Sequence, residues 1–384
     1  MTPLQMVDLK RQYQKIKPEV DAAIAAVIDS TAFIAGKDVQ SFAGELAGYL
    51  GVRYVIPCAN GTDALQIALM ALGLKPGDEV ITPSFTYFAT VEVVALLGLK
   101  PVFVEVLPDT FTMDPASLKA AITPKTRAII PVHLYGQSAP MKEILDIAAG
   151  YNIPVIEDNA QAIGGSYTFP DGTVRMNGSM GTIGTTSFFP SKNLGCYGDG
   201  GAMFTNDDVL AEKLKMIANH GQKVRYYHDM IGCNSRLDSI QAAILRVKLK
   251  ELDSYCDARR AAAGYYDNAF SGNKLITIPF RAPYSKHVFH QYTLQLHESI
   301  DRDQVHQKLA DKGIPSMIYY PVPCHRQKMF LRMDGNAFDL PVTDSLTPKV
   351  ISLPIHTELT EEELRFITSG LLEVLEELKQ PQNI

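Results

Sequence analysis

The chain has 384 residues, of which 46% are hydrophobic and 20% are charged. This composition excludes a globally disordered chain, and the length predicts about two domains. The net charge of −6 argues against a nucleic-acid partner or an anionic membrane surface. The five cysteines are scattered and form no C-x-x-C pair, which favours reduced thiols. Without a recognisable targeting or membrane-spanning segment, we expect a cytoplasmic protein.

The predicted elements begin with two amphipathic helices, over 17–28 and 39–50. Strands and helices then alternate. Strands are predicted at 53–57, 80–83, 101–106, 127–134 and 153–158, and helices at 63–74, 89–97, 115–121 and 141–151. Short β-branched strands separated by helices indicate βαβ units and a mostly parallel sheet.

The pattern changes after about residue 180, where two short strands flank a Gly-rich loop. A single long helix is predicted from Asp238 to about Phe270, because no Gly or Pro occurs before Gly264. The two short strands lie at 185–190 and 201–206, and a further strand at 290–296 and a helix at 303–314 precede a final strand-like piece and helix. We expect a large α/β domain over 1–245 and a smaller α+β domain over 246–384.

The loop CANGTDAL (58–65) lies between a predicted strand and a predicted helix. It places Gly61 and Thr62 at the helix N-terminus, where backbone N–H groups and the helix dipole favour an anion such as phosphate. The same residues also fit an ordinary strand–helix turn with Thr62 as the N-cap. The loop alone leaves both interpretations open.

Two carboxylates, Glu157 and Asp158, end the strand of IPVIEDNAQ (153–161). Buried carboxylates are costly unless they are paired or functional, and open α/β sheets bind ligands at the carboxyl ends of their strands. Asp158 is therefore predicted to hold a cationic nitrogen. A helix N-cap is the alternative.

Lys192 lies in TTSFFPSKNLGCYGDGG (185–201), close to Ser187 and Ser191, in an apolar and Gly-rich frame. Desolvation in such a frame lowers the pKa of a lysine and makes its neutral amine a nucleophile. An exposed loop lysine is the alternative.

A fourth motif, IGCNSRLD (231–238), offers Asn234 and Arg236 as donors to phosphate or carboxylate, although N-capping by Asp238 also explains much of it.

Together these motifs resemble the DegT/DnrJ/EryC1/StrS sugar aminotransferases, which use pyridoxal 5′-phosphate and have the aspartate-aminotransferase fold, fold type I. The resemblance covers essentially the whole chain and departs at Ala43, where the family usually has Glu. It implies a large fold type I domain with a mostly parallel sheet and a smaller C-terminal α+β domain. Further matching segments are VDLKRQY (7–13), FIAGKDVQSF (33–42), PGDEVITPSFTYFAT (76–90), YYPVPCH (319–325) and SLPIH (352–356).

The resemblance also implies residue roles. Lys192 would bind the pyridoxal aldehyde and shuttle a proton, and Asp158 would keep the pyridinium nitrogen protonated. A homodimer with shared active sites is implied, because the family places the Asn that corresponds to Asn234 in the neighbouring subunit's site. The other cofactor contacts expected are Gly61, Thr62 and Ser187 at the 5′-phosphate, Gln161 at the phenolic oxygen, Tyr87 on the ring face, and Asn234 from the partner.

Transamination is favoured because Lys192 is present where the family's dehydratases have histidine. The motif variants look most similar to enzymes that aminate C3 of a UDP-linked 2-acetamido-3-oxo-glucuronic acid for bacterial O-antigen and lipopolysaccharide synthesis, with L-glutamate as donor. Arg236 would pair with the C6 carboxylate of that sugar. Further candidates for substrate binding are Thr31, Phe33, Ser191, Tyr319 and Tyr320.

Alternatives stay open at this point. The substrate could be a neutral dTDP- or UDP-linked deoxy keto sugar aminated at C3 or C4, or the chain could be a non-catalytic nucleotide-sugar-binding homologue. Arg236 could instead form an ion pair with Asp238 or Glu157, and the two tyrosines could simply pack. The roles of His220 and His325 are undecided, and the histidine spacing predicts no metal site.

Overall fold

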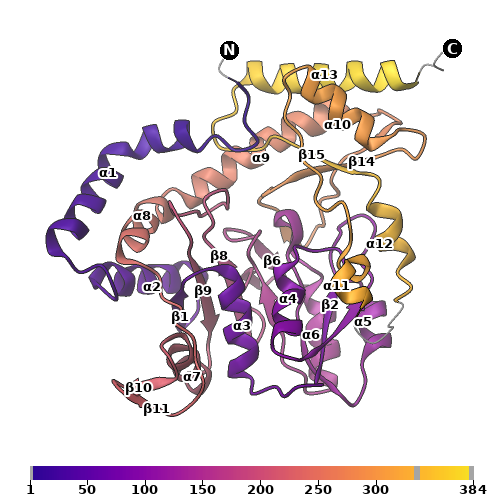
Figure 1. Ribbon diagram of the computed structural model, residues 1–384. Coiled ribbons are helices and arrows are strands. Elements are labelled where there is room, and N and C mark those ends of the chain that lie inside the picture. Colours follow the sequence, from indigo (N-terminus) through magenta and orange to yellow (C-terminus); the bar gives the residue numbers. More distant parts are fainter. Residues whose placement is uncertain (1–2, 333–337, 380–384) are drawn as a thin grey trace.

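The computed structural model describes residues 3–332 and 338–379 of the chain (Figure 1). Two helices come first, α1 (Leu9–Ser30) and α2 (Lys37–Leu50). The side chain of Asp8 accepts a hydrogen bond from the Arg11 amide and caps α1, so this helix begins well before residue 17, where it was predicted to start. Pro18 lies within α1 and does not end it.

A mostly parallel sheet forms the centre of the molecule, as predicted. Its strands are β1 (Tyr54–Cys58), β2 (Glu79–Pro83), β3 (Lys100–Val104), β4 (Thr126–Ile129), β5 (Ile156–Asp158), β8 (Ile183–Ser187) and β9 (Gly201–Thr205). The order is β3-β2-β4 in one part and β5-β8-β9-β1 in the other, and parallel bridges from Ile129 to Val155 and from Val132 to Asp158 join the two parts. Strand β9 is antiparallel to both of its neighbours, and the other pairings are parallel.

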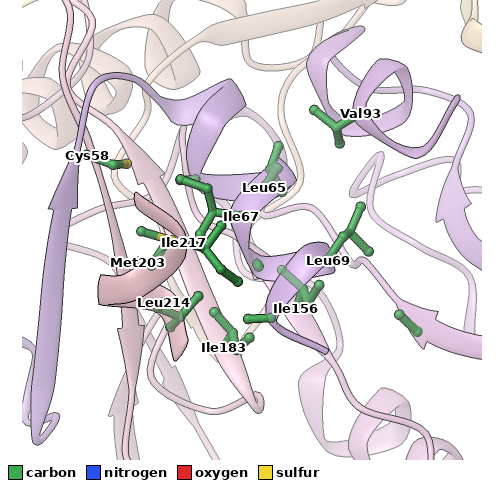
Figure 2. Close-up of a cluster of buried hydrophobic side chains, with 14 of the residues drawn as sticks. Cys58, Leu65, Ile67, Leu69, Val93, Ile156, Ile183, Met203, Leu214 and Ile217 are labelled. Carbon is green, nitrogen blue, oxygen red and sulfur yellow. The ribbon is translucent and has the colours of Figure 1, made fainter. Parts of the chain in front are cut away.

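Helices cover this sheet and form a hydrophobic core with it. They are α3 (Gly61–Ala71), α4 (Ala89–Leu96), α5 (Pro115–Ala121), α6 (Met141–Gly150) and α7 (Asp208–Ala218). Figure 2 shows the buried cluster in which α3 and α7 meet the sheet, with Leu65, Ile67, Leu69, Ile156, Ile183, Met203, Leu214 and Ile217. Each buried Leu or Ile contributes roughly 1.5–3 kcal/mol. This packing holds the N-terminus of α3 at the carboxyl edge of the sheet.

The predicted single helix from Asp238 to Phe270 is wrong. The structure has two helices, α8 (Ser239–Leu249) and α9 (Leu252–Phe270), separated at Lys250 and Glu251. Helix α8 packs against α1 and α2, whereas α9 packs against α13 (Glu361–Lys379). The break separates two helices that pack against different partners, and no Gly or Pro marks it in the sequence.

The C-terminal part has its own hydrophobic core, which α9, α10 (Arg302–Asp311) and α13 share with a small antiparallel sheet. That sheet has the order β12-β14-β15. Its strands are β12 (Ile276–Thr277), β14 (Tyr292–Leu296) and β15 (Val350–Leu353). The boundary expected between residues 245 and 246 lies within α8, and it stays a prediction.

Several short elements complete the fold. They are η1 (Leu134–Gly136), β6 (Ser166–Thr168), β7 (Val174–Met176), β10 (Gln222–Val224), β11 (Tyr227–His228), β13 (Ser285–Lys286), η2 (Cys324–Arg326), α11 (Lys328–Leu331) and α12 (Pro341–Leu346). The β10–β11 hairpin projects beside α7 at the lower left of Figure 1. None of the helices within residues 3–332 and 338–379 is both long and apolar enough to cross a membrane.

Candidate active site

A cavity of about 680 Å³ opens at the carboxyl ends of the parallel strands. This is the edge at which open α/β sheets bind ligands. Of the residues predicted for the site, it brings together Gly61, Thr62, Tyr87, Asp158, Gln161, Ser187, Ser191, Lys192, Tyr319 and Tyr320. The lining also includes residues that the sequence analysis did not single out, among them Thr86, Asp199, His290 and Gln291.

The N-terminus of α3 forms one wall of the cavity. Asn60, and not Thr62, is the N-cap, because its Oδ1 accepts a hydrogen bond from the Asp63 amide at 2.8 Å. The amides of Gly61 and Thr62 precede the first intrahelical donor, Ala64, and have no acceptor in the part of the chain that the structure describes. The helix therefore offers two free N–H donors at its positive end, which suits an anion.

Gly61 is required at this wall by its close approach to Ser187. A Cβ on Gly61 would lie 2.6 Å from the Ser187 Cβ, which no side chain tolerates. The glycine thus lets the Ser187 hydroxyl stand beside the free amides of α3. A hydroxyl and two amides in this arrangement can hold a phosphate.

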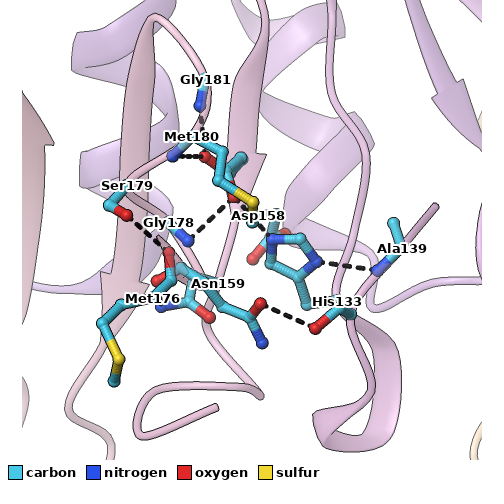
Figure 3. Close-up of polar contacts among 12 residues, drawn as sticks. His133, Ala139, Asp158, Asn159, Met176, Gly178, Ser179, Met180 and Gly181 are labelled. Atoms are coloured by element: carbon cyan, nitrogen blue, oxygen red, sulfur yellow. Dashed lines mark hydrogen bonds and ion pairs between the residues drawn. The ribbon is translucent and has the colours of Figure 1, made fainter. Parts of the chain in front are cut away.

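The two carboxylates at the end of β5 have separate roles. Glu157 is fully buried and accepts hydrogen bonds from the amides of Gly178, Met180 and Gly181. Figure 3 shows these three turn residues near His133. Glu157 Oε2 also lies 2.8 Å from His133 Nε2, while His133 Nδ1 accepts from the Ala139 amide at 3.0 Å. Glu157 is therefore fully occupied in holding the turn and does not face the cavity.

Asp158 lines the cavity instead. Its Oδ2 accepts a hydrogen bond from Thr90 Oγ1 at 2.8 Å, and its Oδ1 accepts from the Ala160 amide at 3.1 Å. Thr90 Oγ1 is in turn 3.1 Å from Thr86 Oγ1. No helix follows Asp158, so its alternative interpretation as a helix N-cap is wrong. The carboxylate is held in place and can pair with a cation in the cavity.

Lys192 faces the same cavity from the loop after β8. Burial lowers the pKa of Lys192 to about 8, and the negative charge of Asp158 opposes this shift. Lys192 is only partly exposed and lines the cavity, so the alternative of an exposed loop lysine is wrong. An amine with this pKa is available as a nucleophile and as a proton carrier.

Polar and aromatic side chains close the cavity on the side of the C-terminal part. Gln161 Oε1 accepts from the Tyr135 amide at 2.7 Å, and Gln161 Nε2 donates to the Tyr320 hydroxyl at 3.0 Å. The rings of Tyr87 and Tyr320 have centroids 6.2 Å apart. His290 is buried, and burial together with the charges of Lys192 and Arg259 lowers its pKa well below the usual value. It is therefore neutral near pH 7.

Four predicted residues lie outside the cavity wall. They are Thr31, Phe33, Asn234 and Arg236, and all four are exposed in this single chain. Asp238 occupies the N-cap position of α8 without a side-chain capping bond. Among the described residues of this single chain, Arg236 forms no ion pair with Asp238 or Glu157, and a structural ion pair of this arginine at the subunit contact stays an alternative.

The comparisons with known proteins agree with this geometry. Residues 14–372 match the DegT/DnrJ/EryC1/StrS aminotransferase family. A relative from Pseudomonas aeruginosa, the UDP-2-acetamido-2-deoxy-3-oxo-D-glucuronate aminotransferase, is 46% identical over 96% of this chain and 99% of its own. A relative from Acidithiobacillus ferrooxidans, the UDP-N-acetyl-3-dehydro-α-D-glucosamine 3-aminotransferase, is 45% identical over 97% and 98%. The crystal structure of NtdA from Bacillus subtilis with the bound cofactor PMP has a TM-score of 0.90 and 33% identity, covering 99% of this chain and 86% of that chain.

Proposed function

Because the chain belongs to the DegT/DnrJ/EryC1/StrS family and is a pyridoxal-phosphate-dependent sugar aminotransferase, we propose a specific reaction for it. It moves an amino group from L-glutamate to C3 of a UDP-linked 2-acetamido-3-oxo-glucuronic acid. The product serves bacterial O-antigen or lipopolysaccharide synthesis in the cytoplasm. The observation that carries the chemistry is that Lys192 and Asp158 line one cavity, close enough for the Asp158 charge to act on the Lys192 amine. Since the chain is an aminotransferase of this family, the alternative of a non-catalytic nucleotide-sugar-binding homologue is excluded.

The residues of the cavity fit the cofactor. The free amides of Gly61 and Thr62 and the Ser187 hydroxyl would hold the 5′-phosphate. Asp158 would pair with the ring nitrogen, Gln161 would donate to the phenolic oxygen, and Tyr87 would cover the ring face. When bound, pyridoxal phosphate supplies an aldehyde carbon that takes up the amino group and a ring that accepts electrons.

The chain's own residues supply the acid–base chemistry. With a pKa of about 8, about a tenth of the Lys192 amine is unprotonated at pH 7, which lets its Nζ attack a carbonyl carbon and exchange protons. The Asp158 carboxylate, fixed by Thr90 and the Ala160 amide, keeps a proton on any nitrogen placed against it. Tyr319 and Tyr320 would limit the entry of water and contact the sugar.

An acidic substrate needs a cation other than Lys192, and the described residues of this single chain place none in the cavity. Lys192 is the only lysine or arginine among the described residues that line it. In the proposed dimer, a second copy brings Asn234 to the phosphate and Arg236 to the C6 carboxylate. A group of exposed apolar side chains in the chain segment just before Asn234 supports a partner copy there. It comprises Val224, Tyr226, Tyr227 and Ile231, all at least 60% exposed.

A neutral 3-keto sugar is the second candidate substrate. The Acidithiobacillus ferrooxidans relative acts, by its name, on an N-acetyl-glucosamine derivative and is almost as similar to this chain as the glucuronate enzyme. A coupled amination assay with L-glutamate decides between them. It uses UDP-linked 3-keto uronate, the corresponding neutral UDP sugar and a dTDP-linked deoxy keto sugar. Turnover of the uronate at less than a tenth of the rate of a neutral sugar would refute the proposal.

Arg236→Lys tests how the acidic sugar is recognised. A guanidinium makes two parallel charge-assisted hydrogen bonds to a carboxylate, and lysine cannot reproduce them. We expect KM for the uronate to rise about 10–100-fold and KM for the neutral sugar to change less than about threefold. Arg365→Lys, at an exposed arginine of α13, is the control and should change neither KM. Equal losses for both sugars would contradict carboxylate recognition.

Asn234→Asp tests the shared site by subunit mixing. A carboxylate beside the 5′-phosphate would weaken cofactor binding, and Lys192→Ala would remove the nucleophile. If Lys192 of one copy and Asn234 of the other form each site, a mixed dimer of the two variants has one intact site. At limiting cofactor, mixing the two inactive proteins should therefore restore up to about a quarter of wild-type turnover. No gain on mixing, or an active monomer by light scattering, would refute the shared site.

A further inference from the structure

A contact between the buried residues Ser84 and His325 lies outside the cavity, with the partly exposed Asp344 at its edge. Ser84 directly follows β2, His325 lies in η2, and Asp344 lies in α12. Ser84 Oγ is 2.6 Å from His325 Nδ1, and the His325 amide donates to the same oxygen at 3.0 Å. His325 Nε2 is 3.3 Å from Asp344 Oδ1.

The residue types are those of a hydrolytic triad, but the burial excludes that role. Ser84 is 0% exposed and does not line the cavity, so its hydroxyl cannot reach an external carbonyl. Burial lowers the pKa of His325, which keeps the imidazole neutral near pH 7. A neutral ring with Nδ1 as acceptor fits a Ser84 hydroxyl that donates to it. The Ser84 carbonyl also accepts from the Cys324 amide at 3.0 Å. The contact is therefore a tether between the end of β2 and the segment 319–327.

This tether holds the segment that carries Tyr319 and Tyr320 into the cavity. The Tyr135 hydroxyl donates to the Tyr319 carbonyl, and the Tyr320 hydroxyl accepts from Gln161. These contacts hold the start of the segment, whereas its end is held by Ser84. Thr86 and Tyr87, just beyond Ser84 in the chain, line the same cavity. Loosening the tether would thus move two walls of the cavity relative to each other.

We propose that His325 is a positioning residue, which through Ser84 holds Tyr319 and Tyr320 at the place where the keto sugar binds. This inference rests on the proposed function, in which the two tyrosines contact the sugar. The sequence motif around His325 does not by itself indicate this role. The role is distinct from catalysis, because His325 does not line the cavity.

Two substitutions of His325 separate the tether from general packing. His325→Asn keeps an acceptor near the position of Nδ1, and His325→Gln keeps polar atoms near Nε2 but loses the contact with Ser84. Ser84→Ala removes the same contact from the other side. His356→Gln is the matched control, since His356 is also buried and its Nδ1 also accepts a hydrogen bond from a backbone amide.

Hydrogen exchange of the substrate-free holoenzyme is the first readout. We expect amides of 319–327 to exchange at least about tenfold faster in His325→Gln and Ser84→Ala, with α3 unchanged, and to exchange nearly normally in His325→Asn. The second readout is kinetic. KM for the keto sugar should rise about tenfold in the first two variants, with kcat within about threefold of wild type.

The outcomes distinguish the tether from the proposed function. Unchanged exchange in 319–327, faster exchange throughout the chain, or equal effects of the Asn and Gln variants would overturn the tether. Faster local exchange with an unchanged KM would overturn its positioning role. If the wild-type enzyme turns over none of the three nucleotide sugars of the amination assay, the substrate proposal fails. The difference in hydrogen exchange between His325→Asn and His325→Gln then decides by itself whether the tether exists.

Discussion

Replacing Lys192 with alanine is expected to lower kcat at least about a thousandfold. The substitution removes both the nucleophile and the proton carrier of the proposed site, and the loss of such a group is of this order. Cofactor binding should persist, because Gly61, Thr62, Ser187 and Asp158 remain. Steady-state turnover and the stoichiometry of bound cofactor measure the two effects separately.

A second buried lysine provides the matched control. Burial lowers the pKa of Lys248 to about 8 as well, but this lysine lies in α8 over the Tyr197 ring and outside the cavity. Reduction of the holoenzyme with borohydride should attach the cofactor to Lys192 and leave Lys248 unlabelled, as peptide mass spectrometry would show. Labelling of Lys248, or turnover by Lys192→Ala within tenfold of wild type, would contradict the assignment.

The alternating part of the fold could be predicted because each of its elements has a local pattern. The strand predicted at 53–57 is β1, and the helix predicted at 141–151 is α6. Short strands such as β13 lack such a pattern. Its two residues pair with β6, more than a hundred residues earlier in the chain, so tertiary contacts and not local preference create the strand. The break between α8 and α9 is missed for the same reason.

The site residues, too, could be predicted only where a local sequence pattern marks them. Asp158, Ser187 and Gly61 could be predicted because each adjoins the carboxyl end of a strand, and these ends meet at one edge of the sheet. His290 reaches the cavity from a distant segment, at a position predicted as the start of a strand. Its burial beside Lys192 depends on how the C-terminal part packs, which no local signal encodes.

The two adjacent carboxylates Glu157 and Asp158 have different roles that the sequence alone does not distinguish. Glu157 and Asp158 are both buried at the end of β5, yet the alternation of side chains along a strand directs them to opposite sides. Glu157 holds the turn at 178–181, and Asp158 faces the cavity. Their neutral isosteres are therefore expected to fail in different ways.

Asp158→Asn is expected to lower kcat about 10²–10³-fold with little effect on stability. The amide keeps the shape, because its oxygen can accept from the Ala160 amide and its NH2 group can donate to Thr90 Oγ1. It removes the negative charge that would keep the ring nitrogen of the cofactor protonated. Loss of one preorganised electrostatic contact at a reacting group costs about this much. Thr90→Val, which removes the hydrogen bond of 2.8 Å to Asp158 Oδ2, should cost about tenfold.

Glu157→Gln should instead lower the stability of the protein and leave kcat nearly unchanged. It leaves the His133 ring and the amides of the 178–181 turn with a weaker acceptor in a fully buried position. Removing one partner of such a buried charged network costs about 3–5 kcal/mol of unfolding free energy, which denaturant titration measures. The kcat of the folded fraction should stay within about threefold of wild type, because Glu157 does not face the cavity. If Glu157→Gln instead lost kcat as severely as Asp158→Asn at unchanged stability, the division of roles between the two carboxylates would be wrong.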